Sequence, residues 1–469
     1  MKKSQISIAI LGVLGAVWAG STWYTGKVAE QEYLKYVENV NQKLATQATS
    51  PNFHVAINDL QFKRGFFSSD ISYKVNLDIN EKQYEIPFKE KFYHGPITLN
   101  DFSLALFSSK AEMVKNELTS SWFKDDKTNP LQITYALGYD KRIRSKAKSD
   151  VAVKTEKMLV DWAINSTFNS DDMDGFGQGE LHLNEMSMTG LSGDQIVVKL
   201  KDGSIHADLQ PIENLAHLFK GTYSINVKDI DISSLKKQDL KVKLKNLNNT
   251  VTMAEKEGFV DIGVSYKLDD LLWAGQSFFG GELSTQFNHV NALALNNLLV
   301  ISQNMTATGN THLQDELAIQ EAKEILNDAP EIKVSPLMLS NSKGKISANL
   351  DLAFVHDVEK VAASQTILGL FNRLSANIEL DKAVIKEFIR LIQLQKLQNN
   401  EMAEQIAEKT VNELYFQAIG SNAFVVNGDK LTLTMNLEDN KLKFNDKFFT
   451  DEEIRFLLML SGIGYKLGY

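Results

Sequence analysis

Apolar side chains alternate with polar ones, with a period of two residues, over much of this 469-residue chain. The alternation is clearest from Ile71 to Ile79, where every second residue is Ile, Tyr, Val or Leu. A two-residue period places apolar side chains on one face of a strand and polar ones on the other. The same pattern recurs at residues 53–57, 181–188, 196–209, 223–232 and 259–268. It predicts a body of mostly antiparallel strands with one face in water.

One seven-residue pattern occurs twice in the second half of the chain. Residues 346–352 and 374–380 both read apolar, Ser, Ala, Asn, apolar, acidic, apolar, and residues 283–287 are a looser copy. Each copy places its apolar side chains on one face of a strand. The copies predict neighbouring strands of one long sheet, with coincidence in β-rich sequence as the alternative.

Helical spacing of apolar residues is concentrated between about 313 and 419. It predicts helices over 313–326, 382–397 and 401–419, and shorter helices over 111–118, 158–168 and 211–219. The expected fold class is therefore α+β and β-rich. Its main part is a large body of mostly antiparallel, curved sheet with packed helices, and an N-terminal helix precedes it.

Residues 1–26 predict a cytoplasmic start and a membrane anchor. Lys2 and Lys3 precede an uncharged stretch from Ile6 to Tyr24, which at about 1.5 Å per residue crosses most of a bilayer core. Lysines at the near end and aromatic rings at the far end favour a single-pass membrane protein with its N-terminus in the cytoplasm and its body on the other side of the membrane. The alternative is a cleaved signal peptide, because Val17 and Ala19 have the spacing of a processing site.

Within this stretch, Gly12, Ala16 and Gly20 are four residues apart and share one helix face. Small residues at this spacing let two membrane helices approach closely, which favours a homodimer. The competing interpretation is that small residues are simply common in membrane helices.

Residues 27–50 predict an amphipathic connecting helix, and residues 51–469 the β-rich body. The apolar stripe of the helix pairs with a second copy or packs on the body, and we favour packing on the body. Its members are Tyr33, Tyr36, Val37, Val40 and Leu44. No glycine-, serine- or proline-rich linker divides the body, so one continuous architecture is expected.

The amino-acid composition of the chain limits which partners and which chemistries are expected. Lysine and arginine total 50 against 59 aspartate and glutamate residues, a formal net charge of -9. Because an acidic surface repels phosphate backbones, nucleic acid is not an expected partner. With 0 cysteines, the chain can form no disulfide, thiolate metal site or thiol nucleophile.

The only metal-like pattern that we find in the sequence is an acidic, glycine-rich stretch ending at Glu180. Asp172, Asp174 and Glu180 approach the order of a calcium loop, but Ser170 takes the first position and the closing glutamate comes one residue early. We favour a polar turn and expect no metal or other cofactor. The 8 histidines are scattered singly, and no serine lies in a G-x-S-x-G turn. No motif supports an enzyme.

Two short motifs link consecutive strands in the first hundred residues. Both read as turns, in which Gly65 takes a positive φ and Pro96 restrains the residue before it. The functional alternative is that Arg64 and His94 offer a cationic handle to a partner or an anionic headgroup. The motif residues are Arg64, Gly65, Phe66, Phe67, Ser68, Ser69, His94, Gly95 and Pro96.

In this order, behind a short N-terminal anchor, the two motifs resemble the YdgA/YihF-like family of Gram-negative inner-membrane-anchored periplasmic proteins of unknown function. The strand-like segment 442–445 fits the resemblance, whereas Asn445-Asp446-Lys447 departs from the family's usual Asn-Gly-Lys. The resemblance implies an inner-membrane anchor, a periplasmic body and self-association, and it supplies no catalytic residues. A more distant similarity, in architecture only, is to AsmA-like envelope proteins with an apolar sheet groove.

Three hypotheses for the function follow. The leading one is a non-enzymatic scaffold or binding module in envelope maintenance, acting as a homodimer. The second is lipid binding or transfer, with a phospholipid held on an apolar sheet face. The third is a periplasmic hydrolase, which requires His94, Asp172, Asp174 or other acids to converge in a polar cleft.

Overall fold

The computed structural model describes most of the chain. The described residues are 21–45 apart from 23, 25, 29, 32, 36 and 43, then 53–79, 82–100, 102–125, 127–154, 157–170, 177–237, 240–308, 312–356, 368–420 and 424–454. Two compact units divide the chain, Met1–Gln210 with Gln303–Gly309, and Pro211–Ser302 with Asn310–Tyr469.

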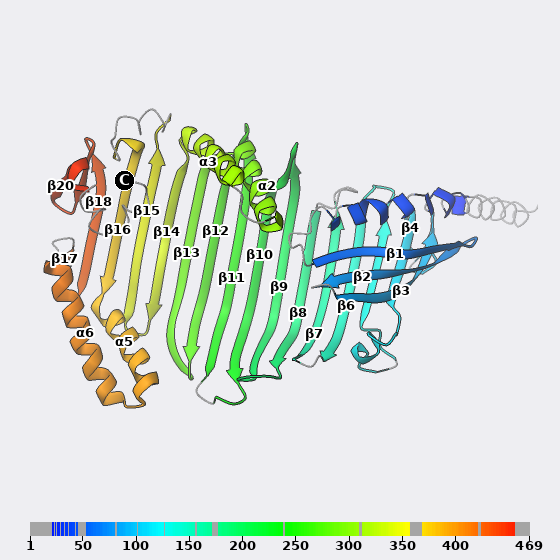
Figure 1. Ribbon diagram of the computed structural model, residues 1–469, viewed down its shortest axis with the longest axis horizontal. Helices are drawn as coiled ribbons and strands as arrows, with labels where there is room; N and C mark the ends of the chain where they lie inside the picture. The colour runs from blue at the N-terminus through cyan, green and yellow to red at the C-terminus, as the bar shows by residue number, and fades with distance from the viewer. Residues whose placement is uncertain are drawn as a thin grey trace, which may run out of the picture. The chain divides into compact units, whose positions relative to one another are not determined.

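The first unit is an antiparallel sheet in which each strand pairs with the next one along the chain (Figure 1). A short 3-10 helix, η1 (Ser120–Trp122), interrupts the series. The strands are β1 (Phe53–Arg64), β2 (Ser68–Ile79), β3 (Lys82–His94), β4 (Phe107–Met113), β5 (Leu131–Leu137), β6 (Ile143–Lys154), β7 (Met158–Ser170), β8 (Gly177–Gly190) and β9 (Ile196–Ile212).

Before β1, the described residues between 21 and 45 are helical. Tyr33 and Val37 of this N-terminal helix are buried against Ile71 of β2 and Phe92 of β3. The apolar stripe of the helix therefore packs on the sheet of its own chain.

The second unit is also an antiparallel sheet built largely from sequential hairpins. Its strands are β10 (Leu215–Ser234), β11 (Lys241–Lys256), β12 (Phe259–Trp273), β13 (Gln276–Asn291), β14 (Glu331–Asn341), β15 (Gly344–Phe354), β16 (Phe371–Asp381), β17 (Val425–Asn427), β18 (Lys430–Glu438), β19 (Lys441–Phe444) and β20 (Lys447–Phe449). A second 3-10 helix, η2 (Leu368–Leu370), precedes β16. The prediction of a β-rich fold with an extensive antiparallel sheet is confirmed.

The repeated seven-residue pattern lies on paired strands, as the sequence predicts. Its two copies occupy β15 and β16, which are antiparallel neighbours with Asn349 opposite Asn377. The looser copy lies on β13, separated from them by β14. The two matching copies are therefore adjacent strands of one sheet.

The named helices that accompany the second sheet are α2 (Ala292–Thr308), α3 (His312–Asn327), α5 (Lys382–Leu397) and α6 (Asn400–Gly420), and the described residues 451–454 are also helical. The helices expected over 313–326, 382–397 and 401–419 are present. Asp381 caps α5, since its Oδ1 accepts a hydrogen bond from the Ala383 N–H at 2.9 Å. The sequence did not predict helix α2. Its apolar residues are spread around the helix and do not form one distinct stripe.

The shorter helices expected over 111–118, 158–168 and 211–219 are wrong. Residues 158–168 belong to β7, because Val160, Trp162 and Ile164 follow a period of two and pair with β6. The segment 111–118 contains the end of β4, and the segment 211–219 contains a turn between β9 and β10. Strand pairing with neighbours outweighed the local helical spacing.

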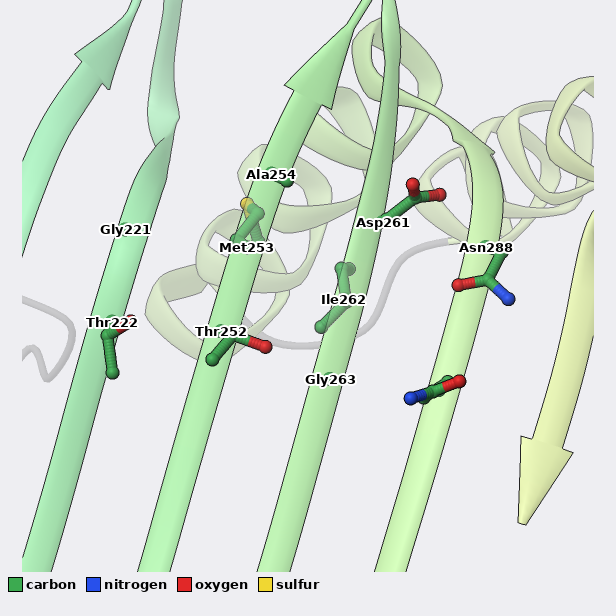
Figure 2. Close-up of a pocket in the computed structure, with 10 residues that line it drawn as sticks. Gly221, Thr222, Thr252, Met253, Ala254, Asp261, Ile262, Gly263 and Asn288 are labelled. Atoms are coloured by element: carbon green, nitrogen blue, oxygen red, sulfur yellow. The ribbon is translucent and has the colours of Figure 1, made fainter. Parts of the chain in front are cut away.

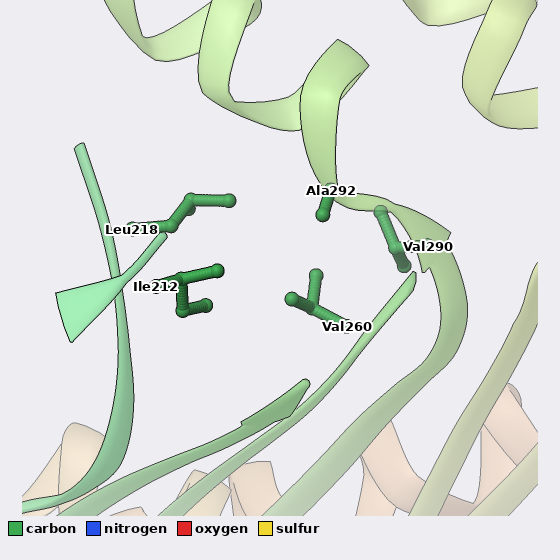
Figure 3. Packing of buried hydrophobic residues seen from close by; sticks show 5 residues of the cluster. All are labelled: Ile212, Leu218, Val260, Val290 and Ala292. Carbon is green, nitrogen blue, oxygen red and sulfur yellow. The ribbon is translucent and has the colours of Figure 1, made fainter. Parts of the chain in front are cut away.

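A buried cluster joins the start of α2 to its sheet (Figure 3). Val260 of β12 is fully buried between Ile212, Leu218, Val290 and Ala292. The five side chains of this cluster come from four strands, β9, β10, β12 and β13, and from the first residue of α2. The cluster therefore fixes where α2 leaves β13 and folds back on the sheet.

Among the described residues, no helix is long and apolar enough to span a membrane. Most of the expected membrane span, from Ile6 to Gly20, lies outside the described residues, and this part includes Gly12 and Ala16. Asp172 and Asp174 of the calcium candidate also lie outside the described residues. The membrane anchor, its packing face and most of the calcium loop therefore stay predictions.

Burial of one face of α5 generates a stability prediction. Leu391 is 2% exposed in α5, whereas Leu397 at the end of the same helix is 39% exposed. Leu391→Ala should destabilise the second unit by about 2 to 5 kcal/mol, because it leaves a cavity that the surroundings fill only in part. Urea unfolding followed by tryptophan fluorescence measures the change. Leu397→Ala is the matched control, and equal losses from both variants would contradict the packing.

Candidate functional site

The two sequence motifs meet at one end of the first sheet, where β1 turns into β2 and where β3 ends. The Gly65 N–H donates to the Ser68 carbonyl at 3.0 Å. Gly65 does not adopt the positive φ that we expected. A side chain there would place its Cβ 2.5 Å from the Ser68 carbonyl oxygen, so close approach of the backbone requires the glycine.

His94 is held between two partners from the other motif. Its Nδ1 lies 3.0 Å from the Phe66 carbonyl oxygen and its Nε2 lies 2.8 Å from Ser69 Oγ. Because a carbonyl only accepts hydrogen bonds, Nδ1 carries the proton and Nε2 accepts from the Ser69 hydroxyl. Burial lowers the pKa of His94, so the ring is neutral at pH 7. His94 is therefore not the cationic handle that the sequence suggested.

The Ser69 and His94 side chains have the contact that a serine hydrolase needs, but not the access. Ser69 is 0% exposed and His94 is 1% exposed. A hydrolytic serine must reach a substrate, and the second nitrogen of its histidine usually faces a carboxylate rather than a carbonyl. The pair consequently ties the two motifs together inside the fold.

Glycines let backbone and helix close around His94. At Gly26 of the N-terminal helix, a Cβ would lie 2.4 Å from His94 Nδ1. At Gly95, a Cβ would lie 2.0 Å from the Ala105 carbonyl oxygen. Real Cβ atoms do not approach this closely, so both positions exclude a larger residue unless the neighbours move. The first contact places the start of the helix directly over the motifs.

A buried carboxylate makes the second connection between helix and sheet. Glu90 of β3 is 3% exposed. Its carboxylate accepts hydrogen bonds from Tyr33 of the helix at 2.9 Å, from Tyr135 of β5 at 2.6 Å, and from Ser109 of β4. Three hydroxyl donors compensate a charge that would otherwise be costly to bury.

Burial sets the protonation of this cluster. Desolvation raises the pKa of Glu90, although the hydrogen bonds from Ser109, Tyr135 and Tyr33 act in the opposite direction. Desolvation and the nearby carboxylate also raise the pKa of Tyr33 and of Tyr135. The tyrosines therefore remain donors at physiological pH. At the surface, Arg64 Nη1 pairs with Glu30 Oε2 of the helix at 3.0 Å.

Our sequence reasoning missed Glu90, although a signal for it existed. Ile86, Phe88 and Phe92 are buried at alternate positions of β3, and Glu90 and His94 continue the same register. A charged residue on the inward face of a strand is unusual unless it is partnered. The period that predicted the strand thus also marked its buried polar residues.

The second sheet has one apolar face and one polar face. Opposed residues on neighbouring strands share a face, so the registers define rows across the sheet. One row contains Val251, Val264, Thr285, Val334, Leu350, Ala376 and Met435. The row beside it points the other way and contains Thr252, Gly263, Gln286, Lys333, Asp351, Ser375 and Asn436.

The described helices cover the apolar face near the two ends of the strands. At the end of β13, Phe287 packs in the cluster that contains Ala292 of α2 and Ile325 of α3. At its start, Phe279 contacts Phe388 of α5 with ring centroids 5.9 Å apart. Between them, Leu283 lies opposite Tyr266 and Leu337, which are 47% and 43% exposed. We call the surface around these three residues the apolar trough.

The polar face has a shallow hollow of about 400 Å³. Figure 2 shows Thr222, Thr252 and Asn288 along its strands, with helices behind the sheet. Gly263 lines the hollow, and a Cβ there would lie 2.6 Å from Thr252 Oγ1, so a larger residue would require the threonine side chain to move. Its lining includes one acidic side chain, that of Asp261.

Glu180, the described member of the calcium candidate, lies among histidines. Its carboxylate is 3.5 Å from His182 Nε2 and 3.6 Å from His206 Nδ1. Over the part of the chain that the structure describes, no three histidine or acidic side chains are placed to hold a metal ion. Of the residues that the hydrolase hypothesis names, His94 is enclosed by the helix and the motifs. Asp172 and Asp174 lie outside the described residues, so their convergence with other acids stays a prediction.

The Gly26 contact generates a second prediction. Alanine normally stabilises a helix relative to glycine by about 1 kcal/mol. Gly26→Ala should instead lower stability and expose the N-terminal helix to protease, because its Cβ collides with His94. Limited trypsin digestion and thermal melts measure both effects. Gly420→Ala in α6 is the control, since nothing lies within 4 Å of the added Cβ there. A Gly26 variant as resistant as the control would contradict the contact.

The Glu90 cluster generates a pH prediction. The folded-state pKa of Glu90 is raised above its usual value of 4.5, so its contribution to stability is complete below that value and is lost as pH rises through the folded pKa. Subtracting the unfolding free energy of Glu90→Gln from that of the wild type at each pH should therefore give a difference that declines above pH 4.5. Exposed Glu117→Gln is the control. A difference that rises with pH would refute the assignment.

Comparison with known proteins places the chain among bacterial relatives. It is 20% identical to the uncharacterized protein YihF of Escherichia coli over 483 aligned positions, which cover 97% of this chain and 98% of YihF. It is 24% identical to the protein YdgA of E. coli over 88% of each chain. An uncharacterized protein of Haemophilus influenzae is 25% identical over 64% of this chain and 86% of that protein.

A family model described as a bacterial protein of unknown function, DUF945, matches residues 1–451. This match covers both motifs, the Glu90 cluster and all of the strands of the second sheet. The relatives YihF and YdgA also confirm the resemblance that the two motifs indicated. The chain therefore belongs to the DUF945 family of bacterial proteins.

Proposed function

We propose that this protein is a single-pass inner-membrane protein whose periplasmic body binds lipid acyl chains in the apolar trough. Anchorage is supported by the uncharged stretch from Ile6 to Tyr24 and the two lysines before it. Binding is supported by one observation, the apolar sheet face that the described helices cover near the strand ends and not around Leu283.

The chemistry of the trough suits hydrocarbon. Beside the apolar row that starts at Val251, a second row on the same face contains Asn249, Tyr266, Leu283, Leu337, Ala348, Ile378 and Leu433. In these two rows, the polar side chains are those of Asn249, Thr285 and Tyr266. Asn249 already donates to the Ser265 carbonyl at 3.2 Å. A sheet face offers no free backbone groups, because the strand ladders use them, so a peptide could not bind here by adding a strand. An acyl chain needs only apolar contact.

The dimensions of the trough fit the same occupant. From Phe279 under α5 to Phe287 under α2 the strand advances eight residues, or roughly 27 Å at about 3.4 Å per residue. One leaflet of a bilayer core is about 15 Å thick. An extended acyl chain therefore fits along the strands between the helices. The scaffold hypothesis differs in its occupant, because a second copy of the chain would cover the same face in a homodimer.

A matched pair of variants tests lipid binding. Tyr266→Glu places a charge in the trough, whereas Lys267→Glu places the same residue on the polar face of the same strand, where the lysine is 63% exposed. The full-length protein is reconstituted in phosphatidylethanolamine vesicles that contain a lipid with a photoactivatable acyl chain. Mass spectrometry then locates the cross-linked peptides.

We expect cross-links on residues 259–291 in the wild type and in Lys267→Glu, and a several-fold loss in Tyr266→Glu. Charge in the trough excludes hydrocarbon, whereas charge on the wet face does not. Cross-links confined to residues 1–26 would reject lipid binding by the body. If Tyr266→Glu instead dissociates a dimer without any change in lipid cross-linking, the scaffold hypothesis replaces this proposal.

A further inference from the structure

Exposed apolar side chains gather at the end of the first sheet where the two motifs lie. They come from the β1–β2 turn and from the link between β3 and β4. We call them the apolar tip: Phe66 at 48% exposed, Phe67 at 37%, Ile97 at 38%, Leu99 at 39%, Phe102 at 78% and Leu104 at 75%. Monomeric soluble proteins rarely present such a group of large apolar side chains to water.

The tip is built by specific contacts rather than by a loose loop. Ile97 and Leu104 form a β-bridge, and the Thr98 N–H donates to the Ser103 carbonyl at 3.0 Å. The His94 N–H donates to the Phe67 carbonyl at 3.0 Å, which joins the two parts of the tip. Phe102 has a φ of 54°, a conformation that aromatic residues rarely adopt, and it is the most exposed residue of the six. The backbone thus holds this ring away from the core.

The start of the N-terminal helix lies at the same end of the sheet (Figure 1). Gly26 contacts His94, whose partners Phe66 and Phe67 belong to the tip. The expected membrane span ends at Tyr24, two residues or about 3 Å of helix before Gly26. The chain therefore leaves the proposed bilayer beside the tip.

Charge at this end fits a membrane surface. Lys63 precedes the β1–β2 turn, and Lys141 and Arg142 are exposed in the β5–β6 turn. The β5–β6 turn lies at the same end of the sheet, because the Leu106 N–H beside the tip donates a hydrogen bond to the Leu137 carbonyl at the end of β5. Tyr139 in that turn is 53% exposed. Cations beside exposed aromatic rings suit anionic headgroups above the acyl region, although the chain as a whole has a formal charge of -9.

We infer that the apolar tip inserts into the periplasmic surface of the bilayer that holds the anchor. The aromatic and aliphatic side chains enter the acyl boundary, and the lysines and arginines remain at the headgroups. The sheet is then attached to the membrane at two places, by the anchor and by the tip. This inference rests on the proposed membrane anchorage and is independent of lipid binding in the apolar trough.

Site-directed spin labelling of the full-length chain tests the inference. With 0 native cysteines, each single-cysteine variant carries one label. Phe102→Cys reports the tip and Val13→Cys reports the expected span. Leu191→Cys, at a 37% exposed apolar residue where β8 ends, reports the opposite end of the same sheet. The protein is reconstituted in vesicles of phosphatidylethanolamine and phosphatidylglycerol, and collisions with oxygen and with a water-soluble nickel chelate are measured.

We expect the oxygen-to-nickel collision ratio at Phe102→Cys to exceed that at Leu191→Cys several-fold and to approach that at Val13→Cys. A Phe102 label in water with the Val13 label in lipid would overturn tip insertion and leave the anchor intact. Both labels in water would overturn anchorage and tip insertion together. A Phe102 label shielded from both reagents and broadened by a second label would show a second copy at the tip, which also overturns the inference.

Discussion

The antiparallel ladder constrains everything else in this protein. Each strand uses its backbone hydrogen bonds on its two neighbours, so only side chains remain to determine what each face contacts. Because side chains alternate, a strand with apolar residues at every second position necessarily has one face that avoids water. Helices α2, α3, α5 and α6 and the N-terminal helix all pack against such apolar faces. The proposed trough is the part of the apolar face of the second sheet that these helices do not cover.

The buried Glu90 cluster has a different role from that of the apolar contacts. Hydrophobic packing of Tyr33 and Val37 would hold the N-terminal helix on the sheet in several similar positions. A carboxylate with three hydroxyl donors from different elements is satisfied in one arrangement only. Together with the Gly26 contact to His94, it gives the helix a defined rotation and a defined height on the sheet.

Period-two alternation was sufficient to predict the β-rich class, many of the strands and the pairing of β15 with β16. It failed where the period breaks. In β11 the apolar spacing shifts between Leu244 and Leu247, and the sequence does not read as one strand, yet Asn246 takes a φ of 51° and the strand continues. The motifs were recognised from sequence, but the neutral state of His94 was not, because it depends on Phe66, Ser69 and Gly26 enclosing the ring.

The construction of the second sheet from sequential hairpins has a consequence for its width. A hairpin leaves a sheet edge and returns to it, so duplication of one hairpin in the gene restores both the chain direction and the phase of the alternation. Each added hairpin widens the apolar face by two strand spacings, about 10 Å, and leaves the motif end unchanged. Insertion of whole hairpins would therefore change the width of such a sheet in steps of about 10 Å, and the area of its apolar face would change in the same steps.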